Sequence, residues 1–567
     1  MLDLQLFIRS LKRNKLFSTV NILGLTIGFF TALLIFLFVK GEFTYDQFHE
    51  KKERIYRVNQ TFIWGEDNPN QFSATGPGVG FAIKQEIQEV EEVTRVFLLG
   101  DIGPIIFDSE GKQQIFTDEV VFGVEDSFLE VFDFDFHYGD PSSALSEPYS
   151  VVLKRETAER FFGQNDPLGK VLSMDNGDLY TVTGVLDDLG QNSHFDQASV
   201  LISLNSIPRI KSSDDNWMWT MFETFILLRP DADFAIVEEK IKKLPEQYVG
   251  TTLSWMGYTY EEYIAAGKKW DLFLHALPDL YLFSDNVYSR LAPTGNLRVV
   301  IALIGAAIFL LVLSCINFIN LSTASFTARA KDVALRKVIG APKLVLGFRF
   351  FKEALLYAVF SMVLAIVIAS LTIPSINQQL DLFLSLDSVF SIEILLFLSL
   401  LLLLVSFVTG IYPFVFFNKF QPIKSLKGEL KSGRKGLRIR NGMLITQYSV
   451  SFLLIISSLT LYDQLNFMLR ADVGFKKNNL LVLENVNWLS SSQAFIDELS
   501  ALTGIEKITH CDGVPMFITQ GDQFTPNDPD AGSVPLNFAR GDEHYLQALD
   551  LQLVMGRSFS ESFQTDS

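Results

Sequence analysis

Five long apolar segments constrain this chain more than any other feature of its sequence. A helix needs about 20 apolar residues to cross the roughly 30 Å hydrocarbon core of a bilayer, and few buried helices of water-soluble proteins stay apolar on every side for so long. The segments that reach this length are 17–39, 297–321, 355–373, 394–417 and 443–462. We therefore expect a membrane protein with five α-helical transmembrane segments.

The positions of the basic residues predict how these segments are oriented. Lys and Arg collect in cytoplasmic loops, and here they cluster before the first segment, between the second and third, and between the fourth and fifth. If the segments alternate, the N-terminus, the loop 322–354 and the linker 418–442 are cytoplasmic. Residues 40–296, the short loop 374–393 and residues 463–567 then lie in the periplasm. This predicts a multi-pass protein of the cytoplasmic (inner) membrane.

Residues 1–16 are expected to form an amphipathic helix at the cytoplasmic face of the membrane. Leu4, Phe7, Ile8 and Leu11 recur at helical spacing, with basic residues on the other faces. The alternative is a basic tail that only sets topology. A cleavable signal peptide is not expected, because the apolar stretch that follows is too long and has no small-residue cleavage site after it.

The first outer region is acidic and has the patterns of a mixed α+β domain. It carries 43 acidic against 20 basic residues between positions 41 and 296. Runs of β-branched and aromatic residues predict strands, apolar positions at helical spacing predict helices, and Gly-Pro and Asn-Gly pairs predict turns. The strands are expected at 180–186 and 223–228, the helices at 154–161 and 233–244, and the turns at 76–78 and 175–177. The region after 462 is expected to be a second, incomplete periplasmic domain.

No pattern in the chain predicts a catalytic, cofactor or metal site. Residues 163–171 resemble a phosphate loop, but the glycine spacing is one residue too long and no Ser or Thr follows Lys170, so we expect a turn. Ser193, His194 and Asp196 are too close in sequence for the opposed geometry of a catalytic triad. The six histidines are scattered, and the two cysteines lie far apart in different surroundings. We expect a non-catalytic subunit without a nucleic-acid partner.

A short repeat links the two outer regions. Residues 128–134 (FLEVFDF) match 545–551 (YLQALDL), and Gly139 matches Gly556 at the same offset. Each copy follows a membrane segment that begins after a basic stretch. Internal similarity at long spacing predicts a duplicated architecture, in which the second unit is incomplete where the sequence stops at Ser567.

These features together resemble the FtsX-like, MacB-like family of ABC transporter permeases. After the second apolar segment the chain resembles the family signature, and the outer region resembles the MacB-like periplasmic core domain. The end of the fourth segment is similar as well. The motifs that carry the resemblance are 317–322 (NFINLS), 329–341 (RAKDVALRKVIGA), 161–163 (FFG), 166–170 (DPLGK), 182–185 (VTGV), 193–196 (SHFD), 410–413 (GIYP) and 421–423 (QPI).

The resemblance implies a separate cytoplasmic ABC ATPase that docks on this chain. We expect it to dock on a short helix, 326–339, which Gly340 and then Pro342 bring to an end. An apolar stripe surrounded by bases suits a groove in a partner protein; binding of anionic membrane lipid is the alternative. The residues assigned to this coupling helix are Arg329, Lys331, Asp332, Val333, Arg336, Lys337 and Gly340.

The resemblance also implies mechanotransmission, in which the membrane helices relay ATP-driven motion to the periplasmic domain for export or efflux of substrate. A periplasmic adaptor or other envelope partner would fit this function. The polar groups within the spans, such as Asn317, Asn320, Ser314 and Thr409, are expected to bridge helices. Apart from Arg298 at the end of the second span, the spans lack the charged side chains that an ion pathway needs. The main alternative is an FtsX-like transducer that regulates an envelope enzyme and moves no solute.

Overall fold

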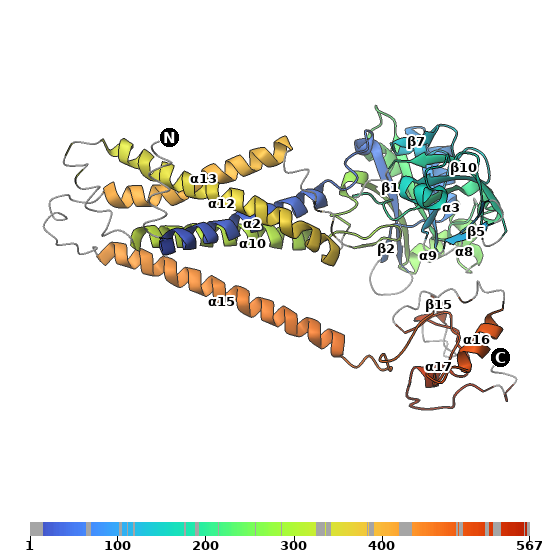
Figure 1. Cartoon of the computed structure of the whole chain (residues 1–567). Coiled ribbons are helices and arrows are strands. Elements are labelled where there is room, and N and C mark those ends of the chain that lie inside the picture. The colour runs from blue at the N-terminus through green and yellow to red at the C-terminus, as the bar shows by residue number, and fades with distance from the viewer. Residues whose placement is uncertain are drawn as a thin grey trace.

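The computed structural model confirms a membrane protein with five long apolar helices and an α/β outer domain (Figure 1). It describes residues 15–63, 70–100, 105–109, 112–116, 119–174, 177–187, 192–213, 215–255, 257–284, 286–324, 335, 339, 342–380, 382, 384, 391–418, 434–483, 486, 491–515, 521–524, 534–560 and 562–563. The five long helices are α2 (Lys15–Phe43), α10 (Leu297–Ala324), α12 (Lys343–Leu380), α13 (Ile392–Asn418) and α15 (Arg434–Arg470).

Each of these helices is longer than the apolar segment that predicted it. The difference is largest for α12, which begins 12 residues before position 355 and continues through Pro374 to Leu380. Lipid thickness limits only the apolar stretch, whereas helical hydrogen bonding continues into the interface on both sides. A membrane helix tolerates a proline where neighbouring groups satisfy the freed carbonyl. Apolar length therefore gave the position of each helix but not its ends.

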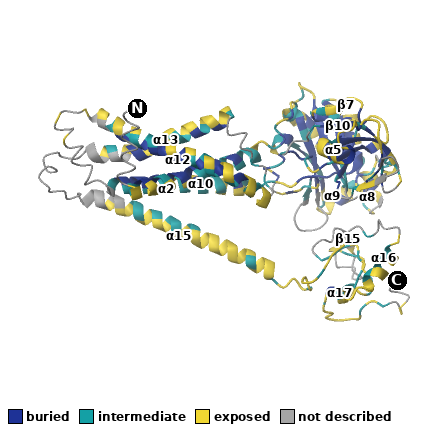
Figure 2. Cartoon of the chain, viewed as in Figure 1, coloured by how far each residue is buried: buried dark blue, intermediate teal, exposed yellow. Residues whose placement is uncertain are grey.

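Four of the five helices form a bundle around one apolar core. Helix α2 packs against α10 and α12, and α13 packs against α12 and α10. Leu25, Phe29 and Leu33 of α2 are the centre of this core and are almost completely buried. Helix α15 contacts α10 but diverges from the bundle along its length, and none of its apolar window is buried (Figure 2).

The first outer region is built on one sheet of 14 strands. The strands run in the order β14-β2-β1-β12-β3-β6-β11-β8-β10-β9-β4-β5, with β13 also paired to β1 and β7 to β10. Their bounds are β1 (Ile55–Ile63), β2 (Asn70–Phe72), β3 (Val90–Gly100), β4 (Ile105–Ser109), β5 (Lys112–Phe116), β6 (Val121–Val124), β7 (Phe136–Gly139), β8 (Ser150–Lys154), β9 (Val171–Ser173), β10 (Leu179–Leu186), β11 (Val200–Ser203), β12 (Phe222–Leu228), β13 (Lys269–Ala276) and β14 (Val287–Tyr288).

Short helices cover this sheet and bury its apolar side chains. They are α3 (Pro77–Glu86), α4 (Phe128–Val131), α5 (Arg155–Phe162), α6 (Pro208–Lys211), α7 (Phe234–Tyr248), α8 (Gly250–Trp255) and α9 (Tyr260–Ala265), with 3₁₀ turns at Lys52–Arg54, Leu204–Ser206 and Leu277–Asp279. One core gathers phenylalanine rings from α4, β6, β12 and the loop at Phe195. A second core lies between the sheet and α3 and α7.

Most local predictions for this region are confirmed, and one is wrong. The predicted strands coincide with β10 and β12, and the predicted helices with α5 and α7. The turn expected at 76–78 is instead the start of α3: Gly76 is its N-cap and Pro77 its first residue. Proline suits the first helical position, because the N–H that it lacks would have no partner there. Gly163 ends α5 with a φ of +64°, in line with the turn predicted there.

The second outer region has helices α16 (Ser492–Ser500) and α17 (Tyr545–Ala548) and a two-stranded ribbon of β15 (Gly521–Phe524) and β16 (Val534–Asn537). Several features match the first region and support the predicted repeat. Helices α4 and α17 are both four residues long. Gly139 and Gly556 have φ values of +92° and +95°. Glu125, before α4, accepts from the backbone N–H of Arg95 at 2.8 Å, and Asp542, before α17, accepts from that of His510 at 2.7 Å.

Candidate functional site

The predicted coupling residues Arg329, Lys331, Asp332, Val333, Arg336, Lys337 and Gly340 lie outside the described residues, as do residues 1–14 of the predicted amphipathic helix 1–16. Two neighbours of the coupling residues are described. The backbone N–H of Ile339 donates to the carbonyl of Leu335 at 3.1 Å, which is the spacing of one α-helical turn. Both side chains are exposed, at 56% for Leu335 and 77% for Ile339.

Exposed apolar side chains continue into the first turns of α12. Leu344, Val345 and Phe348 are 71%, 58% and 63% exposed. Leu344 and Val345 precede the candidate membrane span of α12, which begins at Gly347. We call the four of these residues that precede the span (Leu335, Ile339, Leu344 and Val345) the inner apolar surface. A set of large apolar side chains outside the lipid is typical of a protein interaction site.

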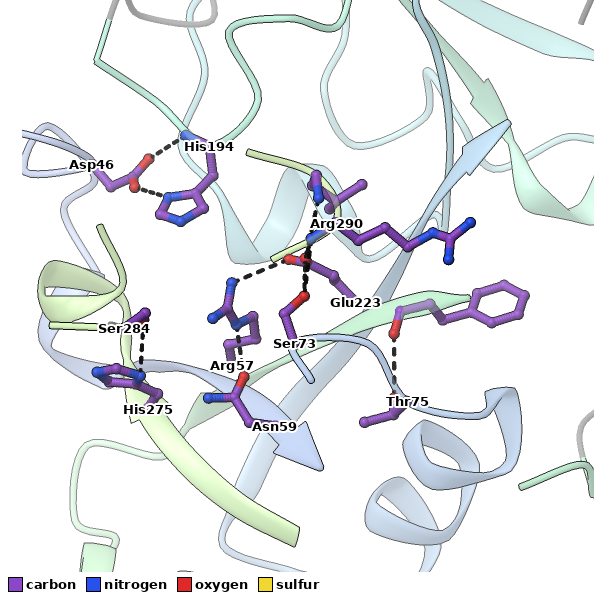
Figure 3. Close-up of polar contacts among 12 residues, drawn as sticks. Asp46, Arg57, Asn59, Ser73, Thr75, His194, Glu223, His275, Ser284 and Arg290 are labelled. Atoms are coloured by element: carbon purple, nitrogen blue, oxygen red, sulfur yellow. Dashed lines mark hydrogen bonds and ion pairs between the residues drawn. The ribbon is translucent and has the colours of Figure 1, made fainter. Parts of the chain in front are cut away.

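At the other end of the bundle, buried polar groups join the membrane helices to the sheet (Figure 3). Asp46 lies three residues after the end of α2 and has a φ of +53°, a left-handed conformation that is uncommon for a residue other than glycine. Its carboxylate accepts from the backbone N–H of His194 at 3.0 Å and contacts Nδ1 of the same ring. Both side chains are completely buried. The backbone N–H of Asp46 donates to the carbonyl of Asn192 at 2.8 Å.

A second buried pair connects the sheet to the segment that returns to the membrane. Arg57 on β1 lies 3.4 Å from Glu223 on β12, and neither side chain is exposed. Oε1 of Glu223 accepts from the hydroxyl of Ser73 at 2.5 Å and from the backbone N–H groups of Arg290 and Leu291 at 3.2 and 3.3 Å. Arg290 and Leu291 stand a few residues before α10. One buried carboxylate therefore bonds both to groups of the sheet and to the segment that leads into α10.

The charges of this pair are stabilised by each other. Burial alone would raise the pKa of Glu223, but the charge of Arg57, the Ser73 hydroxyl and the backbone N–H of Arg290 outweigh it and lower the pKa. Burial lowers the pKa of Arg57, and Glu223 opposes that shift. A buried ion pair is costly to desolvate, and it becomes strongly destabilising when one partner is removed. The pair therefore holds β1 and β12 firmly together.

Two stacked tyrosines add a third link between the same chain segments. The rings of Tyr45 and Tyr281 are parallel, with centroids 4.0 Å apart. The Tyr45 hydroxyl donates to the carbonyl of Ser193 at 3.0 Å, and that of Tyr281 donates to Glu42 at 3.0 Å. Burial raises the pKa of both phenols, so both stay protonated and able to donate.

Two further histidines, His49 near Asp46 and His275 near Arg57, are neutral at ordinary pH. Burial lowers the pKa of His49 to about 4, and burial together with the charge of Arg57 lowers that of His275 to about 4. Nδ1 of His49 accepts from the backbone N–H of Asp133 at 3.2 Å, and Nδ1 of His275 lies 3.3 Å from the Ser284 hydroxyl. We call this set the junction network: Glu42, Tyr45, Asp46, His49, Arg57, Ser73, His194, Glu223, His275, Tyr281, Ser284 and the backbone of Arg290 and Leu291.

Within the membrane, hydrogen bonds join α2 to α12. The Ser18 and Tyr357 hydroxyls are 3.1 Å apart, Ser361 donates to the carbonyl of Ile22 at 3.2 Å, and Thr26 donates to the carbonyl of Ser361 at 3.3 Å. These groups bridge helices in the manner expected of polar residues in a membrane.

The polar residues for which the sequence predicted such bridges behave differently. Ser314 and Thr409 donate to Leu310 and Val405 in their own helices, so the bridging prediction is wrong for these two hydroxyls. A hydroxyl has a carbonyl of its own helix within reach at i−4 and needs no neighbour to satisfy it.

The contact between α2 and α10 rests instead on small residues. A Cβ at Gly24 would lie 3.1 Å from Nδ2 of Asn317, and one at Gly28 would lie 2.6 Å from Oγ of Ser314. Glycines four residues apart let two membrane helices approach closely. We call this contact the α2–α10 seam.

The junction network was not predicted from the sequence, although two signals pointed to it. A lone charged residue interrupts an apolar strand pattern at Arg57 and again at Glu223, and such residues are rarely buried unless paired. Ser193, His194 and Asp196 do not form a triad. His194 contacts Asp46, Asp196 pairs with Lys154 at 3.2 Å, and the Ser193 hydroxyl accepts from the backbone N–H of Phe195.

Comparison with family models gives two matches that follow this architecture. Residues 18–244 match the MacB-like periplasmic core domain, and residues 304–422 match the FtsX-like permease C-terminal domain. The first match covers α2 and most of the outer domain, and the second covers α10, α12 and α13. The chain is also similar to the uncharacterized ABC transporter permease YvrN of Bacillus subtilis (strain 168), with 21% identity over 437 residues that cover 74% of this chain and 98% of YvrN.

Among solved structures, a domain described as a permease protein of Porphyromonas gingivalis matches with a TM-score of 0.34 and 23% identity, over 45% of this chain and 98% of that domain. The periplasmic region of MacB from Actinobacillus actinomycetemcomitans matches with a TM-score of 0.26 and 13% identity, over 40% and 90%. The extracellular domain of the transporter YknZ from Gram-positive bacteria matches with a TM-score of 0.24 and 14% identity, over 38% and 99%.

Proposed function

The chain belongs to the FtsX-like, MacB-like family of ABC transporter permeases, and we propose that it relays the motion of a cytoplasmic ATPase to its periplasmic domain for export or extrusion of substrate. Membership of an ABC permease family implies an ATPase partner on a separate chain. The permease then has two tasks, which are to receive movement at its inner end and to deliver it at its outer end.

The junction network is the observation that carries this proposal. Asp46, just after α2, bonds to the loop at His194. Glu223 on the sheet bonds to the segment that leads into α10. Neither link is a flexible linker, because all four side chains of the Arg57–Glu223 and Asp46–His194 contacts are buried. Movement of either helix end is therefore passed to the same sheet, which a mechanical relay requires and an isolated membrane anchor does not.

The inner apolar surface is our proposed place for the ATPase to dock. Leu335, Ile339 and Leu344 are more than half exposed next to the basic residues assigned to the coupling helix. An apolar stripe rimmed by basic residues suits a groove in a partner. This assignment requires the N-terminus and the loop 322–354 to be cytoplasmic, as the basic clusters predict.

Affinity purification of the full chain from detergent, co-expressed with the ATPase of the same operon, tests the proposal. We expect the ATPase to co-purify with the native chain and to be lost from Arg336→Glu/Lys337→Glu, since the docking helix then carries the opposite charge. The matched control is Lys427→Glu/Lys431→Glu, which reverses two charges in the basic linker outside the docking helix. ATPase retention by the first variant would contradict the docking assignment.

Assays in cells that carry the same variants separate transport from regulation. ATP-dependent loss of substrate from cells, abolished by the docking variant, supports export. Activation of an envelope enzyme without any solute movement would instead favour an FtsX-like transducer and overturn the export part of the proposal.

A further inference from the structure

We propose that Asn21 and Asn320 are positioning residues for the relay, and that their side-chain amides bond to each other across the α2–α10 seam in only one state of the ATPase cycle. The inference rests on the proposed function and names the contact between membrane helices that moves. It does not depend on the identity of the substrate.

The observation behind it is a pair of buried amides without partners. Asn21 on α2 is 1% exposed and Asn320 on α10 is 7% exposed. In each of them both the side-chain nitrogen and the oxygen are buried and make no hydrogen bond within the described part of the chain. Inside a membrane an unpaired amide is more costly than in water-soluble proteins, because no water is at hand. Such a group in a native structure calls for a physical reason.

The register of the seam places the two amides at the same level. Gly24 faces Asn317 and Gly28 faces Ser314, so the helices run antiparallel. Asn21 stands three residues from Gly24 towards the start of α2, and Asn320 stands three residues from Asn317 towards the end of α10. Equal steps in opposite directions bring Asn21 and Asn320 opposite each other. Two amides can satisfy each other with a donor and an acceptor apiece.

The restraints on the two helices indicate where they move. Their outer ends are both held by the junction network. Helix α2 is also bonded to α12 near its inner end, through Ser18 and through Ser361. The inner end of α10 leads directly to the predicted coupling helix. The same helix leads on to α12, so a pull on it displaces the inner half of α10 relative to the bonded α2 and α12, at the level of Asn320.

This geometry explains why two costly amides remain in the seam. In the described state they raise the free energy, and in a second state they bond and lower it. A group that is satisfied in one state only biases the equilibrium between the two. Leucine at both positions would fill the seam with no such difference between states.

Disulfide cross-linking in the full complex with its ATPase tests the inference. The variant is Asn21→Cys/Asn320→Cys in a background in which Cys315 and Cys511 are replaced by alanine. We expect its rate of cross-linking to differ on the order of fivefold or more between ADP and vanadate-trapped ATP, which is the scale of coupling between sites in allosteric proteins. The matched control is Ala32→Cys/Leu310→Cys, in the outer half of the same seam, whose rate should stay unchanged by nucleotide.

A second set of variants covers the possibility that cysteine disturbs packing. Asn21→Leu/Asn320→Leu should still bind the ATPase but lose the nucleotide-dependent change in protease cleavage of the periplasmic domain. The single variant Asn320→Gln keeps an amide at this position and should retain a large part of the nucleotide-dependent change in cleavage. A purely structural role would not separate ATPase binding from the periplasmic response.

The possible failures are distinguishable. If the native chain does not retain the ATPase, the proposed function is wrong. If the ATPase is retained while cross-linking at Asn21 and Asn320 is the same in both nucleotide states, or the leucine variant responds normally, the α2–α10 inference alone is overturned.

Discussion

The two outer regions begin with matching elements but differ in what surrounds them. In the first region, Phe128 of α4 is completely buried, and its ring lies against those of Phe132, Phe134 and Phe195. In the second, Leu549, next to α17, is the one buried residue among those described after α15. The short helix, the glycine with positive φ and the carboxylate that caps a backbone N–H are present in both. Local sequence therefore specifies these features without a core.

What the first region adds is partners from far along the chain. Strand β3 is paired on both sides, by β12 and by β6, and α4 packs beneath it. Among the described residues, the equivalent segment of the second region, near His510, has one isolated bridge, between Cys511 and Gly541. Because apolar burial supplies most of the stability of a domain, we expect the two regions to differ widely in how often they open. Three experiments test that difference.

The largest effect is expected from breaking the Arg57–Glu223 pair. Arg57→Met leaves the Glu223 carboxylate buried without its counter-charge, which costs about 3–5 kcal/mol. The matched change in the second region is Asp542→Asn. It weakens bonds to Thr509 and the N–H of His510 in a partly exposed place and should cost about 1 kcal/mol. Hydrogen exchange by mass spectrometry on the full chain in detergent reports both regions at once. Equal effects of the two substitutions would contradict the expected difference in stability between the two regions.

Acidification should also destabilise the first region. His49 has a folded-state pKa of about 4 against 6.5 when unfolded, so the unfolded chain binds more protons between these values. Stability then falls as the pH is lowered from about 6.5 to about 4, by up to about 3 kcal/mol for His49 alone. His275 acts in the same direction.

Urea unfolding at several pH values, followed separately for each region by pulse proteolysis, measures this dependence. His49→Gln should flatten the slope of the first region between pH 4 and 6.5. A slope unchanged by that substitution would mean that His49 is not the group responsible.

The parts of this fold that could be predicted are those that local sequence encodes. The membrane helices follow from apolar length, and β10, β12, α5 and α7 from periodicity. The start of α3 at Pro77 was missed, because a Gly-Pro-Gly run suits a turn and a helix start equally well.

The junction network could not be predicted, since its pairs join residues 148 and 166 positions apart. A single sequence shows that Arg57 and Glu223 are unusual in their strands but not that they meet. Of the two asparagines of the seam, only Asn320 was predicted to bridge helices. Their opposition depends on the register between α2 and α10, which is set by the close approach at Gly24 and Gly28.

The smallest effect, and the most direct comparison, comes from the two repeat glycines. Gly139 and Gly556 have nearly the same positive φ, so replacing either by alanine adds a similar backbone strain of about 1 kcal/mol. At Gly139 the new Cβ would also lie 2.5 Å from the carbonyl oxygen of Thr183 and 2.9 Å from Cα of Gly184, whereas at Gly556 it meets nothing within 4 Å. Backbone cannot move aside as a flexible side chain can, so Gly139→Ala should cost about 1–2 kcal/mol more than Gly556→Ala. Hydrogen exchange at β7 and β10 in the first variant, and at the residues after α17 in the second, measures the two costs separately. If the two substitutions cost the same, then strain at the shared turn outweighs packing around it, and burial is not what separates the two regions at this position.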